Sequence, residues 1–283
     1  MEANADIIKH IQTYQGIFQK YNEIKLGNLQ RAMADQQSVI VLDLSPLLLH
    51  TNAPELPGNV AGSRAPCGVY DYVPSPRMID FVAKRFPNTV IPRNKVDNPF
   101  IQMIALMGSC GTIAYTKQSD FDIWICYHEG SHDREAISQF KQKLRNIESW
   151  VFDKYNMEVH FYLNEIGRVR SNIFADDEEQ LSGSSIGVLL KEEFLRSSIV
   201  LNGKIPFWWV VPSGSDDATY TRWLAATNKT ALADQFIDLG NLAIIGQEDF
   251  LSAALFQILK SLGNPFKSII KLGLLERYLN NYM

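Results

Sequence analysis

Cysteine is scarce in this chain of 283 residues, which holds three: Cys67, Cys110 and Cys126. Their number is odd, their spacing is wide and they form no CxxC pair, so the disulfide framework of a small secreted domain is excluded. The five histidines show neither an HExxH pattern nor another zinc-ligand spacing. We therefore expect reduced thiols, no structural zinc and a cytoplasmic protein.

An excess of basic charge and a long apolar run are also missing. The chain has 27 Lys and Arg against 31 Asp and Glu, a net charge of -4, so we expect no nucleic acid as a partner. No run reaches the ~18 apolar residues of a membrane helix. The N-terminus lacks the charged region, apolar core and cleavage site of a signal peptide. No membrane partner is expected.

The chain has enough apolar residues, 46% of the total, to form a substantial core. Apolar periodicity predicts alternating strands and helices in its centre. Ser75 and Pro76 are typical of the N-cap and the first position of another helix. The predicted strands cover 101–107, 121–127, 157–164 and 204–212. The predicted helices cover about 4–33, then 109–117, 134–155 and 184–198.

From Tyr220 onward the apolar spacing is helical throughout, and the SGSDD stretch before it is typical of a connection. We therefore place a domain boundary near Ser213. The prediction is an α+β protein with a mixed sheet, divided into an N-terminal helical segment (1–60), a sheet domain (61–212) and a helical domain (213–283).

The segment MGSCGTIAYTKQSDFDIW contains the clearest functional pattern. Asp120 and Asp122 are two positions apart on a predicted strand, so their side chains project from one face, together with Trp124. Two neighbouring carboxylates repel each other unless a cation lies between them. Hard oxygen ligands of this kind suit Mg²⁺. A lone Asp-x-Asp is common in surface loops, but here it begins an otherwise apolar strand, where uncompensated charge is costly.

Gly108 and Ser109 directly follow the preceding predicted strand and are expected to open the helix over 109–117. The N-terminus of a helix offers free N–H groups and a positive dipole end to an anion. Glycine lets the backbone approach closely, and the serine hydroxyl adds a donor. The segment thus predicts a phosphate site beside a metal site, which is the combination that nucleotidyl transfer requires.

A site for two metal ions usually needs a third carboxylate from a neighbouring strand. In the stretch MEVHFYLN, Glu158 shares a strand face with His160 and Tyr162, so we predict Glu158 as the third ligand. Glu165 is the alternative, although it lies beyond the apolar run. We expect His160 to be a hydrogen-bonded structural residue.

The pattern GSx10DxD, with a carboxylate on a later strand, resembles the signature of the DNA polymerase β-like nucleotidyltransferases. In more detail, MGSCGTIAYTKQSDFDIWIC is similar to the catalytic segment of the class I bacterial adenylate cyclases. The similarity extends from about residue 20 to the C-terminus. Further similar blocks follow in the family's order: DLSPLLLHTNAPELPG, EVHFYLNE, LLKEEFLRSSIVLNGK, FIDLGNL and LFQILKSLGNPFKSIIKLGLLE.

This resemblance implies a polymerase β-like palm, with the C-terminal helical domain completing a nucleotide cleft. The implied reaction converts ATP into 3′,5′-cyclic AMP and pyrophosphate with two Mg²⁺ ions, or with Mn²⁺ in their place. Asp120 and Asp122 would then be metal ligands, and Gly108 and Ser109 the triphosphate turn. Trp124 would either pack against the nucleotide or be a core residue. Family members also carry a C-terminal regulatory region, so the chain is expected to be a catalytic fragment.

Cations that meet the triphosphate are harder to assign. Lys267 and Lys271 are four residues apart, hence on one helical face, which could equally be a solvated basic face. Lys117 is expected to end the helix after Gly108 and Ser109, in a stretch that is bulkier than the family's serine-rich one. Residues 174–185 are predicted to form a loop that closes over the nucleotide.

Two other functions stay open at this point. The motif fits equally an enzyme that transfers AMP to a separate protein, antibiotic or RNA acceptor. It also fits a catalytically inactive module that only binds nucleotide, although such a module has no need for Asp120, Asp122 and Glu158 together.

Overall fold

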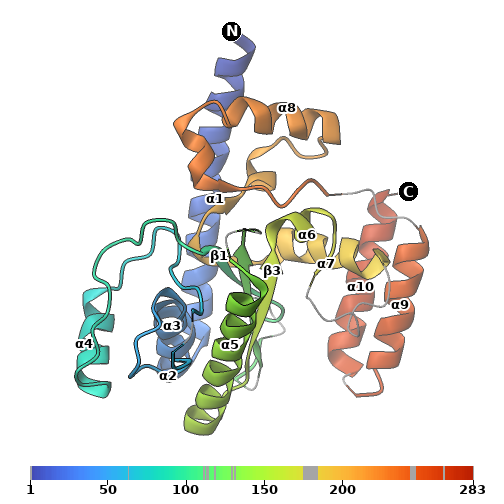
Figure 1. Cartoon of the computed structure of the whole chain (residues 1–283). Helices are drawn as coiled ribbons and strands as arrows, with labels where there is room; N and C mark the ends of the chain where they lie inside the picture. Colours follow the sequence, from blue (N-terminus) through green and yellow to red (C-terminus); the bar gives the residue numbers. More distant parts are fainter. Residues whose placement is uncertain are drawn as a thin grey trace.

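The computed structural model describes residues 2–62, 64–110, 112, 115–117, 119–128, 130, 132–174, 184–242, 247–263 and 265–282. Helices surround a mixed β-sheet, so the α+β prediction is confirmed (Figure 1). Within the described residues, no helix combines the length and the apolar character that a membrane crossing needs.

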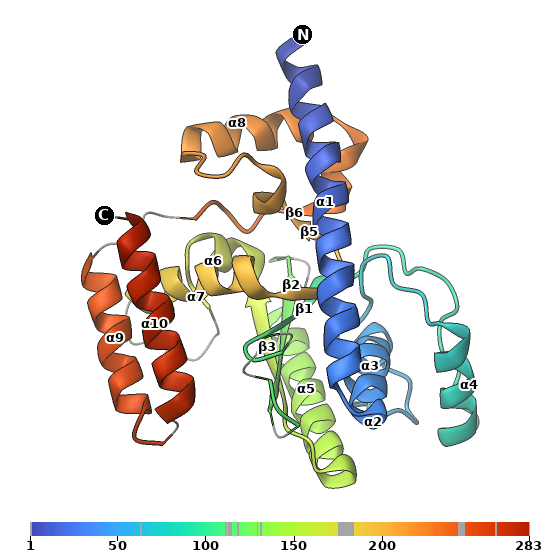
Figure 2. The same cartoon turned by 180° about the vertical axis from the view of Figure 1, so that it is seen from behind.

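The N-terminal part is helical, as predicted. A long helix, α1 (Glu2–Ala32), runs along one side of the molecule, with its N-terminal end projecting beyond the other elements (Figure 2). Three short helical elements follow it. They are α2 (Asp35–Ser38), the π-helical turn η1 (Val39–Leu44) and α3 (Ser45–His50).

Helix α4 (Pro76–Arg85) begins where the sequence predicts. The Ser75 side chain accepts a hydrogen bond from the Met78 N–H at 3.2 Å, and Pro76 occupies the first helical position. Proline is tolerated there because the first N–H groups of a helix have no partner within it.

The main sheet has the strand order β3-β2-β1-β4. Strand β1 pairs antiparallel with β2 and β4, whereas β2 and β3 are parallel and are connected by helix α5 (Arg134–Tyr155). A parallel pair needs such a crossover, because a tight turn only reverses the chain. The strands are β1 (Ile101–Met107), β2 (Phe121–Tyr127), β3 (Val159–Glu165) and β4 (Ile199–Gly203).

The two faces of this sheet pack against different layers. Phe121, Ile123 and Ile125 of β2 belong to a core that includes Phe140 and Ile147 of α5. The alternate residues of β1 and β2 pack against α7 (Ser184–Ser197) in a second core, which contains Trp124, Cys126 and Phe194 among others. Alternation along β2 therefore places Asp122 on the face toward α7.

The predicted strand over 204–212 is wrong for most of its length. Only β5 (Ile205–Pro206) is extended, and it pairs in parallel with β6 (Phe236–Ile237). The 3₁₀ turn η2 (Phe207–Val210) follows, with Phe207 and Val210 buried three positions apart on one side. Strand β4, directly after α7, was not predicted, because a short apolar run gives no decisive periodicity.

The C-terminal part is mostly helical, as expected. Its β6 strand is an exception, and it pairs with β5 across the proposed boundary at 213, a division that stays a prediction. Figures 1 and 2 show α9 and α10 side by side beyond α7. The remaining elements are α6 (Ile166–Arg170), α8 (Asp217–Thr227), the 3₁₀ turn η3 (Ala231–Gln235), α9 (Gln247–Lys260) and α10 (Pro265–Tyr282).

All three cysteines are free, and Cys110 and Cys126 are buried, as predicted. A buried lysine, Lys143 of α5, is less expected. Its Nζ donates to the Thr51 carbonyl at 2.7 Å and to Asn52 Oδ1 at 3.2 Å. Burial lowers the pKa of Lys143 to about 8, so its charge is held in the core at a cost in solvation.

We predict that Lys143→Met flattens the pH dependence of stability. The folded state releases the lysine proton near pH 8, whereas the unfolded chain keeps it until its ordinary pKa of 10.5. The unfolded state therefore binds more protons between these values, and the free energy of unfolding rises from about pH 8 to about pH 10.5. Urea unfolding at a series of pH values measures this slope.

The control for this experiment is Lys154→Met, which removes an exposed lysine from the same helix. It should leave the slope unchanged. Equal slopes for the wild type and Lys143→Met would contradict the prediction.

Candidate active site

The end of β1 and the start of β2 bring the predicted glycine turn and the aspartates together. In the antiparallel pair, Met107 lies opposite Asp122, so the residues after Met107 pass directly over the Asp122 carboxylate. Gly108 has a φ of 92°, in the left-handed region. A Cβ atom at Gly108 would lie 2.9 Å from Asp122 Oδ2. The backbone conformation therefore favours glycine, and a side chain at this position would displace the Asp122 carboxylate.

No helix begins at Ser109, so the predicted helix over 109–117 is wrong for the described part of that stretch. Gly108 and Ser109 lie in a turn instead. The Ser109 carbonyl accepts hydrogen bonds from the Thr112 N–H at 3.1 Å and from Thr112 Oγ1 at 2.8 Å. Local hydrogen bonds of this kind compete with helix formation. The helix dipole thus gives no support to a phosphate site here.

The Ser109 side chain is nevertheless suited to a ligand. Its Oγ atom is buried and has no hydrogen-bond partner among the described residues. A buried hydroxyl without a partner is unfavourable, and such groups in native structures commonly receive a partner from water or a ligand. The turn therefore offers an unused donor next to the Asp122 carboxylate.

Asp122 is the second residue of β2, and Asp120 directly precedes this strand, so the shared strand face of the two aspartates stays a prediction. In the parallel pair β2–β3, Asp122 lies beside His160, and the Phe121 N–H donates to the Glu158 carbonyl at 3.0 Å. Glu158 therefore lies level with Asp120, but it precedes β3 and is exposed. Within the described residues, no three His, Cys, Asp or Glu side chains gather closely enough to hold one metal ion. The role of Glu158 as a third ligand stays a prediction.

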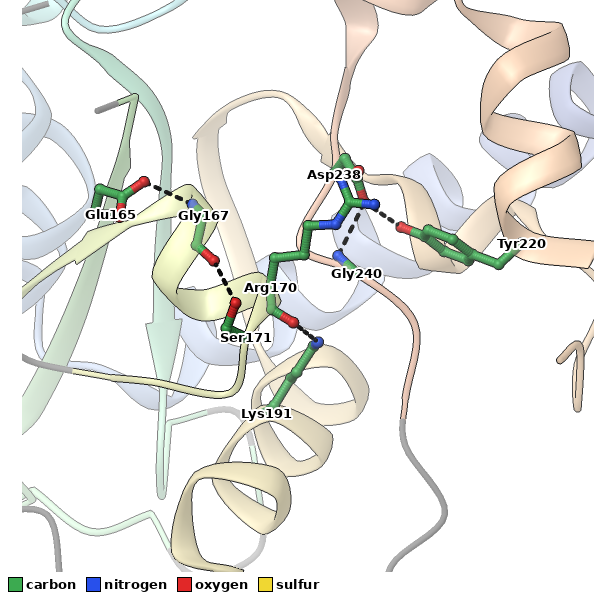
Figure 3. Close-up of polar contacts among 8 residues, drawn as sticks. All are labelled: Glu165, Gly167, Arg170, Ser171, Lys191, Tyr220, Asp238 and Gly240. Atoms are coloured by element: carbon green, nitrogen blue, oxygen red, sulfur yellow. Dashed lines mark hydrogen bonds and ion pairs between the residues drawn. The ribbon is translucent and has the colours of Figure 1, made fainter. Parts of the chain in front are cut away.

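The alternative third carboxylate, Glu165, is at the opposite end of β3. There it accepts hydrogen bonds from the N–H groups of Gly167 at 2.7 Å and Arg168 at 3.2 Å, and so caps α6 (Figure 3). In the parallel register it lies beside Tyr127, the last residue of β2. This distance from Asp122 along the strands removes Glu165 from the candidate site.

Tyr162 is a site neighbour that the sequence did not single out for function. It lies close enough to Asp122 and Asp120 to feel their charge. Burial, and then the negative charges of Asp122 and Asp120, raise the pKa of Tyr162 to about 12. Strand alternation had placed Tyr162 on this face, but only the pairing of β2 with β3 shows which carboxylate it meets.

Trp124 packs as a core residue. Only 4% of its surface is exposed, and its ring stacks on Phe194 of α7 at 4.8 Å between ring centres. Phe174 approaches it edge-on at 5.2 Å. Of the two predicted roles, the structure shows the core one, and contact with a nucleotide stays a prediction.

The predicted cations have different environments. Lys271 Nζ of α10 lies 3.5 Å from Glu193 Oε1 of α7, on the same side of the sheet as Asp122. Lys117 is exposed, and its carbonyl accepts a hydrogen bond from Gln37. The side chain of Lys267 lies outside the described residues, as does most of the predicted closing loop, 175–183.

A second polar cluster joins the FIDLGNL stretch to three helices (Figure 3). Asp238 accepts hydrogen bonds from Arg170 Nη1 at 2.6 Å, from the Tyr220 hydroxyl at 2.8 Å and from the Gly240 N–H at 3.0 Å. Lys191 Nζ donates to the Arg170 carbonyl at 3.2 Å, and burial lowers the pKa of Lys191 to about 8. Sequence reasoning missed this cluster because its members are far apart in the chain. The hydrogen bonds of this cluster connect α6, α7 and α8.

Comparisons with known proteins identify the family of this chain. A family model described as "Adenylate cyclase NT domain" matches residues 10–209, and one described as "Adenylate cyclase, class-I, second domain" matches residues 245–283. The chain therefore contains an N-terminal domain of the adenylate cyclase type, followed by a segment that matches the second domain of these enzymes. The chain belongs to the class I adenylate cyclase family, which confirms the resemblance seen in the sequence.

Individual relatives support the same membership. An adenylate cyclase from Yersinia pestis is 30% identical over 273 residues, which are 95% of this chain and 32% of the relative. An adenylate cyclase from Haemophilus influenzae is 31% identical over 256 residues, or 86% of this chain and 30% of the relative. The chain thus spans about a third of the length of these relatives. No solved structure matches it.

We predict that Gly108→Ala destabilises the protein more than Gly214→Ala does. Gly214 has a φ of 75°, also left-handed, but nothing lies within 4 Å of the position of a Cβ atom. Both substitutions incur a backbone cost of about 1 kcal/mol. Only Gly108→Ala also displaces the Asp122 carboxylate.

The free energies of unfolding in urea, compared between the two variants, measure the difference. Equal losses would show that the close approach of Gly108 to Asp122 has no energetic consequence.

Proposed function

We propose that this chain converts ATP into 3′,5′-cyclic AMP and pyrophosphate, on a polymerase β-like nucleotidyltransferase palm. The observation that carries the proposal is the glycine turn that lies against the Asp122 carboxylate. The next residue of this turn, Ser109, has a buried hydroxyl without a hydrogen-bond partner among the described residues. The turn at Gly108 and Ser109 would bind phosphate next to the Asp122 carboxylate, and nucleotidyl transfer requires this combination. Membership of the class I adenylate cyclase family supports ATP as the nucleotide and cyclic AMP as the product.

The side chains at this site fit a divalent cation. Asp122 of β2 and Asp120, directly before this strand, offer carboxylates, and Ser109 adds a hydroxyl, so every donor is a hard oxygen. Mg²⁺ is commonly held by one or two carboxylates together with substrate phosphates, so a complete cage of protein ligands is not needed. Asp120, Asp122 and Glu158 would hold two Mg²⁺ ions, or Mn²⁺ in their place. The ions would acidify the 3′-hydroxyl and neutralise charge on the phosphates.

The residues of the chain then bind and orient ATP. Gly108 and Ser109 would hold the triphosphate through N–H groups and the serine hydroxyl, so that the α-phosphorus faces Asp120 and Asp122. The 3′-oxygen forms a bond to the α-phosphorus and loses its proton to solvent, while the bond from the α-phosphorus to the bridging oxygen breaks and pyrophosphate leaves. Positioning and charge stabilisation supply most of the catalysis in such transfers.

Other predicted residues would complete the site. Lys271, Lys267 and Lys117 would contact the triphosphate, with Lys271 leaving Glu193 to do so. Trp124 would shape the floor of the nucleotide pocket through its packing on Phe194. A C-terminal regulatory region, as the resemblance to the family implies, would be a further partner of these elements.

Transfer of AMP to a separate acceptor is the second candidate function. The site geometry does not distinguish it from cyclisation, because the two reactions differ only in which hydroxyl attacks. An inactive nucleotide-binding module is a weaker candidate. It would have no use for a glycine forced against a carboxylate.

We predict that the purified chain, given ATP and Mg²⁺ alone, forms cyclic AMP and pyrophosphate. Asp120→Asn should lower turnover by about a hundredfold or more, the scale of loss when one preorganised electrostatic group is removed. Chromatography of labelled products measures both quantities. Asp153→Asn, which alters an exposed carboxylate on α5, is the control and should retain activity.

Labelled AMP attached to an acceptor, without cyclic AMP, would instead establish the second candidate function. Full activity of Asp120→Asn would refute the metal-ligand assignment. ATP binding without any turnover would favour the inactive module.

We also predict that Lys271→Met raises KM for ATP roughly tenfold, equivalent to about 1.4 kcal/mol, with a smaller change in kcat. The reason is the loss of a cation from the triphosphate. Glu193→Gln is the matched control, because it breaks the ion pair to α7 but keeps the lysine. It should leave KM within about twofold of the wild type, since partly exposed ion pairs contribute little. An unchanged KM in Lys271→Met would remove this residue from the site.

A further inference from the structure

We propose that the outer face of the hairpin formed by α9 and α10 is a contact surface for a second copy of this chain, whose own hairpin packs on it. This interaction surface goes beyond the proposed function and does not depend on it. Three observations support it: the apolar side chains that the hairpin exposes, the area that they cover, and a glycine in the middle of the exposed side of α10.

Helix α9 is apolar on two of its sides. On the first side Phe250 is buried, and Ala253 and Ala254 are partly buried, as expected for a helix that packs on α7. The second side exposes five large apolar side chains at helical spacing, the last of them just past the end of the helix: Leu251, Leu255, Ile258, Leu259 and Leu262. A helix that is apolar all round is normally buried all round. Within the described part of the chain, this second side has no covering element.

Helix α10 has the same arrangement. Ser268 is buried, and Leu272 and Leu275 are partly buried, at spacings of four and three along one side of the helix. The other side exposes Phe266, Ile269, Ile270 and Leu274. The two helices pack against each other at the edge of the molecule, and the exposed Leu262 and Phe266 lie where the chain passes from one helix to the next (Figures 1 and 2). These nine exposed side chains of α9 and α10 form the hairpin face.

The hairpin face is large for a protein that acts as a monomer. It holds half of the eighteen large hydrophobic side chains that the described residues expose. At roughly 100 Å² for each side chain its area approaches ~900 Å², whereas the largest apolar patch of a typical monomer covers ~300–600 Å². A stable interface buries about 800 Å² on each partner. The hairpin face alone is therefore large enough for a dimer.

A glycine lies in the middle of the exposed side of α10. Gly273 is four residues after Ile269 and three after Ile270, so it shares their side of the helix. Among the described residues, nothing lies within 4 Å of the position of a Cβ atom at Gly273. Glycine inside a helix is less stable than alanine, and no contact within the described chain requires it here. Because a glycine lets another backbone approach closely, Gly273 favours a helix as the partner of this face over a lipid surface.

A second hairpin is the helical partner that the chain itself supplies. Two copies that use the same surface form a contact with twofold symmetry, which is the commonest arrangement among soluble oligomers. Two hairpins that meet through one apolar face form a bundle of four helices with a shared core. Lys271 lies on the other side of α10, where its Nζ is 3.5 Å from Glu193 Oε1 of α7. The proposed contact therefore leaves Lys271 and α7 unchanged.

Leu255→Glu tests the proposal, because it places a charge in the exposed apolar stripe of α9 without changing a buried residue. Sedimentation equilibrium of the full chain at roughly 1–100 µM, a range that detects micromolar association, measures the mass. We expect the wild type to reach twice the 32.1 kDa of one chain. Leu255→Glu should raise the dissociation constant at least about thirtyfold, as the loss of a central interface residue does. Circular dichroism checks that the variant folds.

Phe152→Glu is the matched control. It introduces the same charge on α5, at a side chain that is 51% exposed, compared with 54% for Leu255. Because Phe152 lies outside the hairpin face, this variant should keep the dissociation constant within about twofold of the wild type.

Gly273→Leu distinguishes close helix packing from unspecific apolar association. The added leucine enlarges the apolar surface, so binding to lipid or unspecific aggregation would become stronger. Packing of a second helix on Gly273 would be blocked instead, and we expect the dissociation constant to rise about tenfold or more. Gly16→Leu is the control, since Gly16 is also exposed within a helix, α1, with nothing described within 4 Å of a Cβ atom. It should leave the dimer unchanged.

Three results would overturn the proposal. The first is a wild-type chain that stays at 32.1 kDa over the whole concentration range; flotation of this monomer with vesicles of phosphatidylcholine and phosphatidylglycerol would then assign the hairpin face to lipid. The second is a dimer that Leu255→Glu leaves intact, because such a dimer uses another surface. The third is stronger association of Gly273→Leu. A wild-type dimer that both variants weaken, with both controls unaffected, supports the proposal.

Discussion

The close approach of the Gly108 backbone to the Asp122 carboxylate is the constraint on which the candidate site depends. It follows from the antiparallel pairing that sets Met107 opposite Asp122. The turn that leaves β1 passes so close to the carboxylate that a side chain at Gly108 would displace it. Because Gly108 has no Cβ atom, the backbone of the turn and the Asp122 carboxylate are close enough to contact the same ligand.

The main sheet supports this approach by separating its two faces. One face of β2 carries Phe121 and Ile123 into the core with α5, where they hold the strand in register. The other face carries Asp122 and Trp124 toward α7. The Asp122 carboxylate therefore lies at the beginning of β2, next to a packed aromatic layer. This layer limits the contact of the carboxylate with water but does not enclose it. Rigid strands place the aspartates more reliably than a loop would.

Much of the fold was predictable, because the spacing of apolar residues along a regular helix or strand indicates which face is buried. The bounds of β1, β2 and α5 match those predicted from the sequence. The two wrong elements, a helix over 109–117 and a strand over 204–212, are short stretches where hydrogen bonding or packing outweighed local propensity. In the first, hydrogen bonds between Ser109 and Thr112 close a turn. In the second, the burial of Phe207 and Val210 favours a 3₁₀ turn.

The sequence by itself determined the family and the bounds of β2, with Asp122 on the face opposite Phe121 and Ile123, because motif spacing and strand alternation are local properties. Only the tertiary structure decided which neighbours those carboxylates have. It brought Tyr162 to Asp122, set Trp124 against α7 and used Glu165 to cap a helix. Each of these results depends on strand register and helix packing. A change of register by one residue would turn every side chain of a strand to the other face, and no local pattern specifies the partner strand.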